Sequence, residues 1–279
     1  MPGTSFETSG AAAAGVGRAP RTSRLFGPLC VLSVTLILAC YVLLVTSNAI
    51  YLGWSDELYF LGHPRMWQRL GLTVWTAAVA TATTLVVGVP AGYALSRLRL
   101  PWPRLMATLV DLPVMLPPAA VGAFMLGLTA SSPARLLLGD SLDHSVAGVI
   151  AVQFVVTVAF CARLMKASFD AVNPRLEQVA RSLGAGRARA FATVTLPLAG
   201  RGIVASAAVV WARAAAKWEA LMLFVGATQG RTDIMPLAVY LDWNGAMMGW
   251  VVSMSLVCVL LAVATMGAVR IIGGRSHVW

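Results

Sequence analysis

The stretch NPRLEQVARSLGAGRARAFATVTLPLAGRGI, residues 173–203, is the longest polar interruption between two apolar segments of the chain. It predicts a helical stretch around Leu176–Leu183 that ends at Gly184-Ala185-Gly186, because glycine allows the left-handed turn that closes a helix. A second short helix follows and ends near Pro197. The stretch therefore predicts a helix–turn–helix element at a membrane surface, with an exposed face suited to a groove on a soluble partner.

Long apolar segments flank this stretch on both sides. Of the 279 residues, 58% are hydrophobic and only 11% are charged, against roughly 25% charged in an average soluble domain. A bilayer core about 30 Å thick needs roughly 20 helical residues to cross it, and backbone polar groups cannot stay unpaired in lipid. The sequence thus predicts an all-α integral membrane protein with about six transmembrane helices. The predicted spans are Phe26–Ile50, Gly71–Leu95, Leu105–Ala130, Ser145–Met165, Gly202–Gly226 and Ala246–Ile272.

The basic residues indicate the orientation of these spans. Most of the 21 Lys and Arg residues lie in the set of loops that includes residues 173–203, whereas the opposite set holds Arg65, Arg69, Arg135 and Arg231. Because Lys and Arg concentrate in cytoplasmic loops, we expect the first set and both termini to be cytoplasmic and the chain to lie in the cell (inner) membrane. The net charge of +10 is explained in this way without a nucleic-acid partner.

The 173–203 stretch resembles the EAA loop of binding-protein-dependent ABC importer permeases. Ala180, Gly184, Val194, Leu196 and Pro197 match that pattern with the right spacing. The sequence departs from the pattern where Gln178 and Val179 replace the usual Glu and Ala, with Glu177 one place early. If the resemblance is set aside, the stretch could be a basic amphipathic loop that only contacts anionic lipid headgroups. Lipid binding, however, does not require the fixed spacing between Gly184 and Pro197.

The resemblance implies a type I, MetI-like permease fold and a division of the chain. Residues 1–24 would be a disordered cytoplasmic tail, 25–273 the transmembrane permease domain with a cytoplasmic coupling loop at 166–201, and 274–279 a second cytoplasmic tail. In the family this loop forms coupling helices in a cleft of the ATPase subunit. The residues expected to couple are Glu177, Gln178, Ala180, Gly184, Ala185, Phe191, Leu196 and Pro197.

The resemblance also implies the partners. We expect two cytoplasmic ATPase subunits, an extracytoplasmic substrate-binding protein and a second permease, identical or homologous, that encloses the path. The sequence contains no phosphate-binding loop, nucleophile elbow or HExxH pair, so we predict no catalytic residues, metal or cofactor in this chain. ATP hydrolysis would belong to the partner.

Two further segments resemble the molybdate, tungstate and sulfate permeases. The third span begins DLPVMLPPAAVG at Asp111, with a Leu-Pro-x-x-Leu-Pro-Pro-like arrangement. Residues 212–214 and the outer-loop motif MPLAVY at 235–240 also look like that group. Residues 215–219, AAKWE, depart from its usual Gly-Glu-Phe-Gly-like stretch. The resemblance implies a small oxyanion as cargo.

Charges inside a span mark a pathway or an ion pair, because they are costly in lipid. Arg213 and Lys217 are four residues apart and are expected to share one helix face, where two cations would lower the barrier for a dianion. Glu219 is expected roughly opposite Lys217. The alternative is that both cations snorkel or form structural pairs. The predicted translocation path comprises Pro117, Pro118, Arg213, Lys217 and Glu219.

Other functions stay open at this point. A permease of the same architecture could carry thiamine, iron, a polyamine or a phosphonate. A secondary transporter would show inverted repeats and midplane carboxylates, and an intramembrane enzyme would need a catalytic dyad within the spans. The sequence shows neither of these patterns.

Overall fold

The computed structural model describes residues 22–52, 54–98, 101–130, 142 and 144–273. Within these ranges every regular element is a helix. The predicted tails at 1–24 and 274–279 lie outside the described residues, except that residues 22–24 already belong to the first helix. The chain divides into two units, Met1–Asn48 and Ala49–Trp279.

Of the first unit the structure describes residues 22–48, which belong to helix α1 (Thr22–Leu52). Its residues from Pro28 to Asn48 form an apolar run of 21 residues, long enough to cross a membrane. This run agrees with the first predicted span, Phe26–Ile50.

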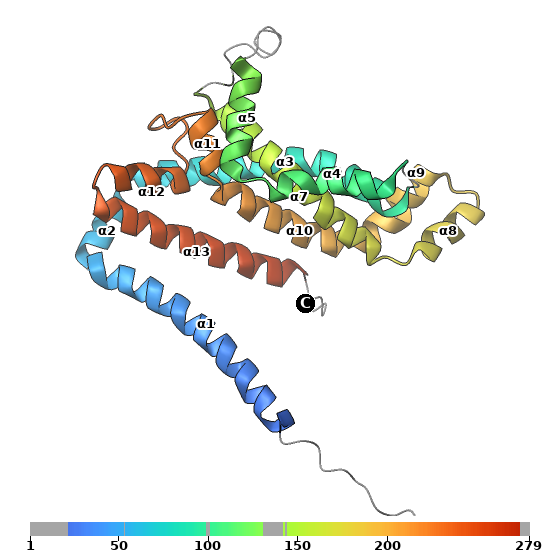
Figure 1. The fold of residues 1–279 in the computed structure, drawn as a ribbon, viewed down its shortest axis with the longest axis horizontal. Coiled ribbons are helices and arrows are strands. Elements are labelled where there is room, and N and C mark those ends of the chain that lie inside the picture. Colours follow the sequence, from blue (N-terminus) through green and yellow to red (C-terminus); the bar gives the residue numbers. More distant parts are fainter. Residues whose placement is uncertain (1–21, 53, 99–100, 131–141, 143, 274–279) are drawn as a thin grey trace, which may run out of the picture. The chain divides into compact units, whose positions relative to one another are not determined.

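The second unit is built on long helices that run alongside one another (Figure 1). Their apolar runs are also long enough to cross a membrane, and three of them coincide with the second, fourth and sixth predicted spans. The helices are α3 (Pro64–Arg97), α7 (Val146–Asp170), α10 (Leu196–Ala216) and α13 (Met248–Gly273). A short helix, α2 (Trp54–Gly62), precedes α3.

The third predicted span, Leu105–Ala130, is wrong as a single helix. It forms α4 (Pro103–Met115) and α5 (Pro118–Ala130), which are bent by 100°. Leu116 has an extended backbone, with ψ at 139°, because Pro117 disfavours the helical conformation of the residue before it. Each half has 13 residues and measures about 20 Å, so neither half alone crosses the hydrocarbon core. Pro117 thus ends α4 and separates it from α5.

The fifth predicted span, Gly202–Gly226, is misplaced. The apolar helical run covers Arg187–Ala216 and consists of α9 (Arg187–Ala190), the π-helix η2 (Phe191–Thr195) and α10. The second short helix therefore does not end near Pro197: that proline lies in the first turn of α10, where a missing N–H is tolerated. A widened π turn directly before a proline absorbs the lost backbone donor.

Beyond α10 the chain forms shorter helices. Helix α11 spans Glu219–Phe224. Helix α12 spans Met235–Asn244 and contains the MPLAVY motif, which the sequence had placed in a loop. Apolar side chains of α5, α7, α11 and α12 form one buried cluster: Val121, Val149, Val152, Val156, Ala220, Leu221, Phe224, Val225, Ile234 and Leu237.

Helices α3 and α7 approach each other closely at two glycines of α3. A Cβ atom added at Gly92 would lie 2.4 Å from the Cβ of Met165, and one added at Gly88 would lie 2.5 Å from the Sγ of Cys161. Small residues let membrane helices pack at this distance without a hydrophobic driving force. The α3–α7 pair is therefore held by backbone-to-backbone proximity.

Buried polar side chains bridge the same helices. The hydroxyls of Thr84 in α3 and Thr157 in α7 are 3.2 Å apart. Gln153 of α7 donates to the carbonyl of Ala214 in α10 at 3.2 Å. Hydrogen bonds between membrane helices contribute only about 0.6 kcal/mol each on average. Their main effect is therefore to fix how the packed helices are oriented relative to one another.

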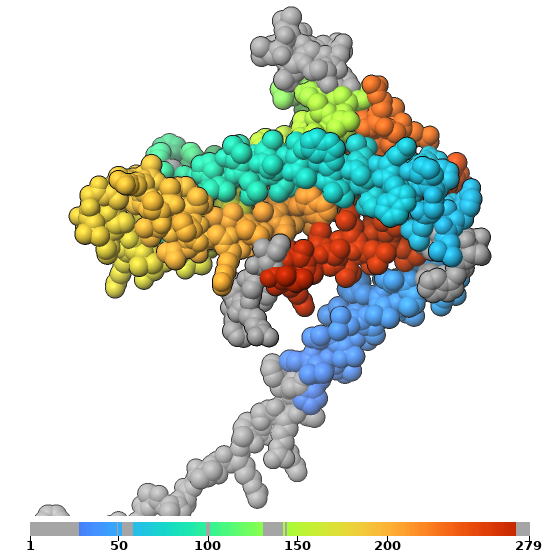
Figure 2. Space-filling view, turned by 180° about the vertical axis from the view of Figure 1, so that it is seen from behind, coloured from blue at the N-terminus to red at the C-terminus, as the bar shows by residue number. Residues whose placement is uncertain are grey.

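The two ends of this bundle carry different elements (Figure 1). Helices α8 (Pro174–Ser182) and α9 lie at one end, named here the loop end. Helices α2 and α12 lie at the other, named here the opposite end. The space-filling view shows the α8–α9 segment, in yellow, as the tip of the loop end (Figure 2).

The close approach of α3 and α7 yields a stability prediction. Gly92→Leu must push Met165 and the Lys166 backbone away, since a Cβ there already overlaps both. Gly71→Leu is the matched control on the same helix, because nothing lies within 4 Å of a Cβ at that position. We expect Gly92→Leu to lower the thermal midpoint of the detergent-purified protein by several degrees, and Gly71→Leu to leave it unchanged. Equal midpoints would contradict the packing described.

Candidate functional site

The loop end begins with a short helix whose two ends are both capped. Asn173 accepts a hydrogen bond from the N–H of Arg175 at 3.0 Å and starts α8. At the other end, the N–H of Gly184 donates to the carbonyl of Arg181 and the N–H of Ala185 to that of Ala180. These bonds form a Schellman motif. Gly184 has a φ of +91°, so the left-handed turn predicted there is confirmed.

Glu177 points into the protein and joins α8 to its neighbours. Its Oε1 accepts from the Tyr93 hydroxyl at 2.5 Å and its Oε2 from the Thr195 hydroxyl at 3.0 Å. The Nε of Arg97 lies 3.9 Å from the same Oε2. The carboxylate is buried, so Glu177 ties α8 to the end of α3 and to η2 through charge-assisted hydrogen bonds.

The end of α3 also holds the end of α7. The Nη2 of Arg97 donates to the carbonyls of Phe169 and Val172, which terminate α7. Phe191 packs against Tyr93, with ring centroids 4.5 Å apart, and against Phe169. Phe191, expected in the coupling loop, is thus part of an internal aromatic cluster.

The outer face of α8 is apolar and uncovered. Leu176, Val179 and Leu183 are all exposed, and their spacing places them on one helix face. Gln178 is exposed beside them, as are Arg181 and Arg187. Among the other residues expected in the coupling loop, Ala180, Ala185 and Leu196 are half-buried and Pro197 is exposed. An exposed apolar face of this kind is typical of an interaction site, and arginines border it.

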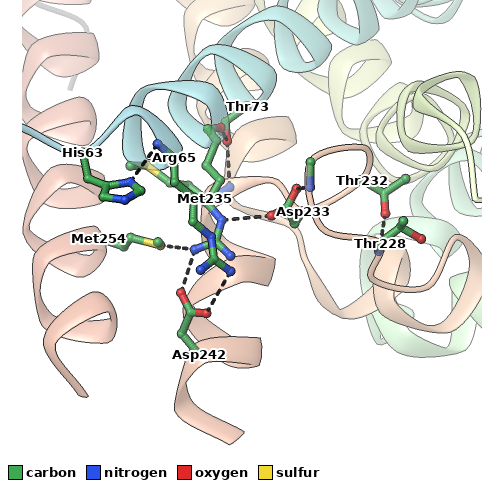
Figure 3. A network of polar contacts seen from close by, with 11 residues as sticks. His63, Arg65, Thr73, Thr228, Thr232, Asp233, Met235, Asp242 and Met254 are labelled. Carbon is green, nitrogen blue, oxygen red and sulfur yellow. Dashed lines mark hydrogen bonds and ion pairs between the residues drawn. The ribbon is translucent and has the colours of Figure 1, made fainter. Parts of the chain in front are cut away.

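The opposite end is organised by a network of polar contacts, which includes Arg65, Asp233 and Asp242 (Figure 3). Arg69 of α3 is 2% exposed, its Nε lies 2.9 Å from Asp233 and its Nη1 lies 2.6 Å from Asp242. The Sδ of Met254 in α13 is 3.4 Å from the same Nη1. Arg65 reaches Asp242 at 3.8 Å. The sequence had placed Arg69 in an outer loop; it is instead the ion-pair centre of the bundle at this end.

Backbone bonds fix the segment that carries the two aspartates. Asp233 accepts from the N–H of Gly230 at 2.7 Å. The hydroxyl of Thr73 in α3 accepts from the N–H of Met235 at 2.8 Å, which anchors the start of α12 (Figure 3). Asp233 and Asp242 therefore bind α12, at both its ends, to the first turns of α3.

The residues predicted for the translocation path are not gathered on one helix face. Pro117 and Pro118 lie at the bend between α4 and α5. Lys217 caps α10 with an extended backbone, so its predicted face shared with Arg213 is wrong. Glu219 begins α11, so its expected place opposite Lys217 on one helix is wrong as well. Helix α10 ends at Ala216, so Lys217 and Glu219 do not continue its helical register.

Arg213 lies within α10 and faces α7. Its guanidinium carbon is 4.5 Å from the centroid of the Phe160 ring, a cation–π distance. The Nε of Arg213 is buried without a hydrogen-bond partner among the described residues. The side chain therefore keeps hydrogen-bonding capacity inside a span.

Several residues of these sites were not found from the sequence. They are Tyr93, Arg97 and Thr195 at the loop end, and Asp233 and Asp242 at the opposite end. The chain has only 11 acidic residues, and two of them stand on either side of the MPLAVY motif. Because acidic residues are so few, Asp233 and Asp242 could have been predicted to pair with a basic residue of another helix.

Solved structures share this arrangement of helices. A chain of the MetNI methionine ABC transporter, in inward-facing conformations, matches with a TM-score of 0.57 at 19% identity, over 76% of this chain and 99% of that one. A chain of a bacterial ABC transporter that imports the acidic polysaccharide alginate matches with a TM-score of 0.59 at 20% identity, over 91% and 98%. The fold is that of an ABC importer permease, and the predicted MetI-like class is confirmed.

The family follows from the sequence comparison. Residues 84–277 match the binding-protein-dependent transport system inner membrane component family. The chain belongs to this family, so it is a membrane-spanning permease subunit. It is 32% identical to the molybdate/tungstate transport system permease protein WtpB of Thermococcus kodakarensis, over 58% of this chain and 62% of that protein. It is 31% identical to the molybdenum transport system permease protein ModB of Escherichia coli K12, over 62% and 78%.

The buried arginine yields the prediction for this site. Arg69→Met would leave Asp233 buried without a counter-charge and Asp242 with only its longer pair to Arg65, at a cost of roughly 3–5 kcal/mol. We expect a marked loss of folded protein, measured as the monodisperse fraction after heating in detergent. Arg65→Met is the control, because its ion pair is longer and partly exposed and such pairs contribute about 0–1 kcal/mol.

A compensating variant separates charge from packing. Adding Asp233→Asn and Asp242→Asn to Arg69→Met removes the unpaired charges, so stability should rise above that of Arg69→Met alone. If the triple variant is no more stable than the single one, the ion pairs do not hold this end together.

Proposed function

We propose that this chain forms the translocation path of an ATP-driven importer for a small oxyanion: molybdate, tungstate or sulfate. The names of its relatives carry the proposal, since two proteins about 31–32% identical to it are permeases for molybdate or tungstate. The path carries a dianion, and the arginines within the spans supply positive charge where lipid supplies none.

The loop end is the proposed contact with the ATPase subunits. The exposed apolar strip of Leu176, Val179 and Leu183 would enter a cleft of that subunit. The inward side of α8 is fixed by Glu177 to α3 and η2, so a displacement of α8 by the ATPase is transmitted to α3 and α10. The exposed arginines of this end support a cytoplasmic orientation.

The opposite end is then extracytoplasmic. We place there the surface that receives a substrate-binding protein. The chain's family is binding-protein-dependent, and an alginate ABC transporter of similar fold was solved in complex with a periplasmic protein. A second permease copy, identical or homologous, would complete the enclosure of the path.

Uptake by the assembled transporter tests the cargo. Cells that express the permease with its cognate ATPase and binding protein should accumulate molybdenum, tungsten or sulfate above cells that lack the permease. Elemental analysis of washed cells measures the first two, and radiolabelled sulfate the third. Uptake of thiamine, iron, a polyamine or a phosphonate in place of these anions would reject the proposed cargo.

Two glycines of the loop test the ATPase contact. Gly184→Asp places a Cβ and a charged side chain in a left-handed turn with φ at +91°, a conformation that glycine adopts without steric cost. Gly186→Asp is the control, because Gly186 starts α9 with a φ of −63°, where aspartate is a favoured cap. We expect Gly184→Asp to insert normally, to lose at least tenfold in uptake and to co-purify less ATPase. Unchanged uptake and co-purification for Gly184→Asp would reject the assignment of this loop.

A further inference from the structure

A further ion pair joins α4 and α7. The Nε of Arg163 in α7 is 3.7 Å from the Oδ1 of Asp111 in α4. The two side chains are 51% and 40% exposed. Arg163 stands seven residues before the end of α7 and Asp111 eight residues after the start of α4, which places them about 10–12 Å from those helix ends.

The exposure of this pair is not compatible with lipid. A charged side chain inside the hydrocarbon region faces the protein interior or a water-filled cavity. Leu109, two positions before Asp111, lies about 200° around the axis of α4 from it. The α4–α7 face that carries Asp111 and Arg163 is therefore the hydrated one.

The backbone of α4 supports the same conclusion. The helix breaks at Leu116–Pro117, just over one turn beyond Asp111. Irregular backbone at membrane depth is tolerated only where it is buried in protein or lines a water-filled cavity. Leu116 packs against the buried apolar cluster, whereas Pro117 beside it is exposed, so one side of the break lies in protein and we expect the other side to be hydrated.

Positive charge continues from this pair across α7. Phe160 and Arg163 are three residues apart, so they are neighbours on one helix face. The guanidinium of Arg213 in α10 lies over Phe160. Asp111, Arg163, Phe160 and Arg213 therefore form a strip across α4, α7 and α10, with two cations and one anion.

A groove elsewhere in the bundle does not offer this chemistry. It has a volume of about 420 Å³ and lies between α10, α12 and α13. Its described lining is mainly apolar, with residues such as Trp211, Val239 and Leu261, and contains no charged side chain. A dianion would lose its hydration there without compensation.

We propose that Arg163 is an anion-binding station of the translocation path, and that Asp111 is its counter-ion while the station is empty. The inference rests on the proposed oxyanion cargo. A permeating anion replaces Asp111 at the guanidinium and then leaves towards the loop end, so the pair must be weak enough to exchange. A half-exposed pair at 3.7 Å meets that condition.

Thiol accessibility tests whether the pair faces water. In a variant without the native cysteines, Asp111→Cys should react with an anionic, membrane-impermeant thiol reagent at least tenfold faster than Leu109→Cys. Molybdate should slow the reaction at Asp111→Cys and leave Leu109→Cys unaffected. Equal rates at the two positions would show that lipid or a second permease covers Asp111, and would overturn the proposal.

Uptake by the full transporter tests the role of the charge. Lys166→Gln is the matched control, because Lys166 forms a similarly exposed pair with Asp170 one turn further along α7. We expect Arg163→Gln to lower oxyanion uptake at least tenfold at unchanged assembly with the ATPase, Arg163→Lys to retain much of it, and Lys166→Gln to transport normally. Equal uptake by Arg163→Gln and Lys166→Gln would overturn the proposal that Arg163 binds the permeating anion.

The wild-type transporter separates the two proposals. If it takes up no oxyanion, the proposed cargo and the station both fail. If it takes up the oxyanion normally while molybdate gives no protection at Asp111→Cys, the station alone fails.

Discussion

The contact between α3 and α7 is the constraint on which both ends of the permease depend. Gly88 and Gly92 let these helices approach until a single Cβ would collide. One helix, α3, then carries Arg69 and Thr73 to one end and Tyr93 and Arg97 to the other. Through these side chains α3 sets the positions of α12 and of α8, both of which lie more than a hundred residues after the start of α3 in the sequence.

Composition and run length were enough to predict the helical membrane class, because lipid leaves a long apolar segment no other structure. The turn at Gly184 was predictable for a similarly local reason. The third and fifth spans were not: Leu116–Pro117 and Lys217 interrupt apolar runs that hydropathy reads as continuous. A window of hydrophobicity contains no term for the effect of a proline on the residue before it or for packing between helices.

The polar contacts show the same limit. Arg69 was assigned to a loop but is buried between two aspartates. Glu177 was expected in the coupling loop, and nothing in the sequence indicated that Tyr93 and Thr195 hold its carboxylate inside the chain. The direction of both side chains depends on residues that are distant in sequence. The family pattern does not specify which face of the segment points inward.

The π-helix at Phe191–Thr195 separates the orientation of α8 and α9 from the orientation of α10, which an ordinary helix would fix together. In this turn the N–H of Leu196 donates to the carbonyl of Phe191, five residues earlier, so one residue more than in an α-helical bond is accommodated. One extra residue rotates everything before it by about 100° relative to α10. The surface that α9 and α8 present can therefore be re-aimed by a single inserted residue, while every membrane-facing position of α10 keeps its direction.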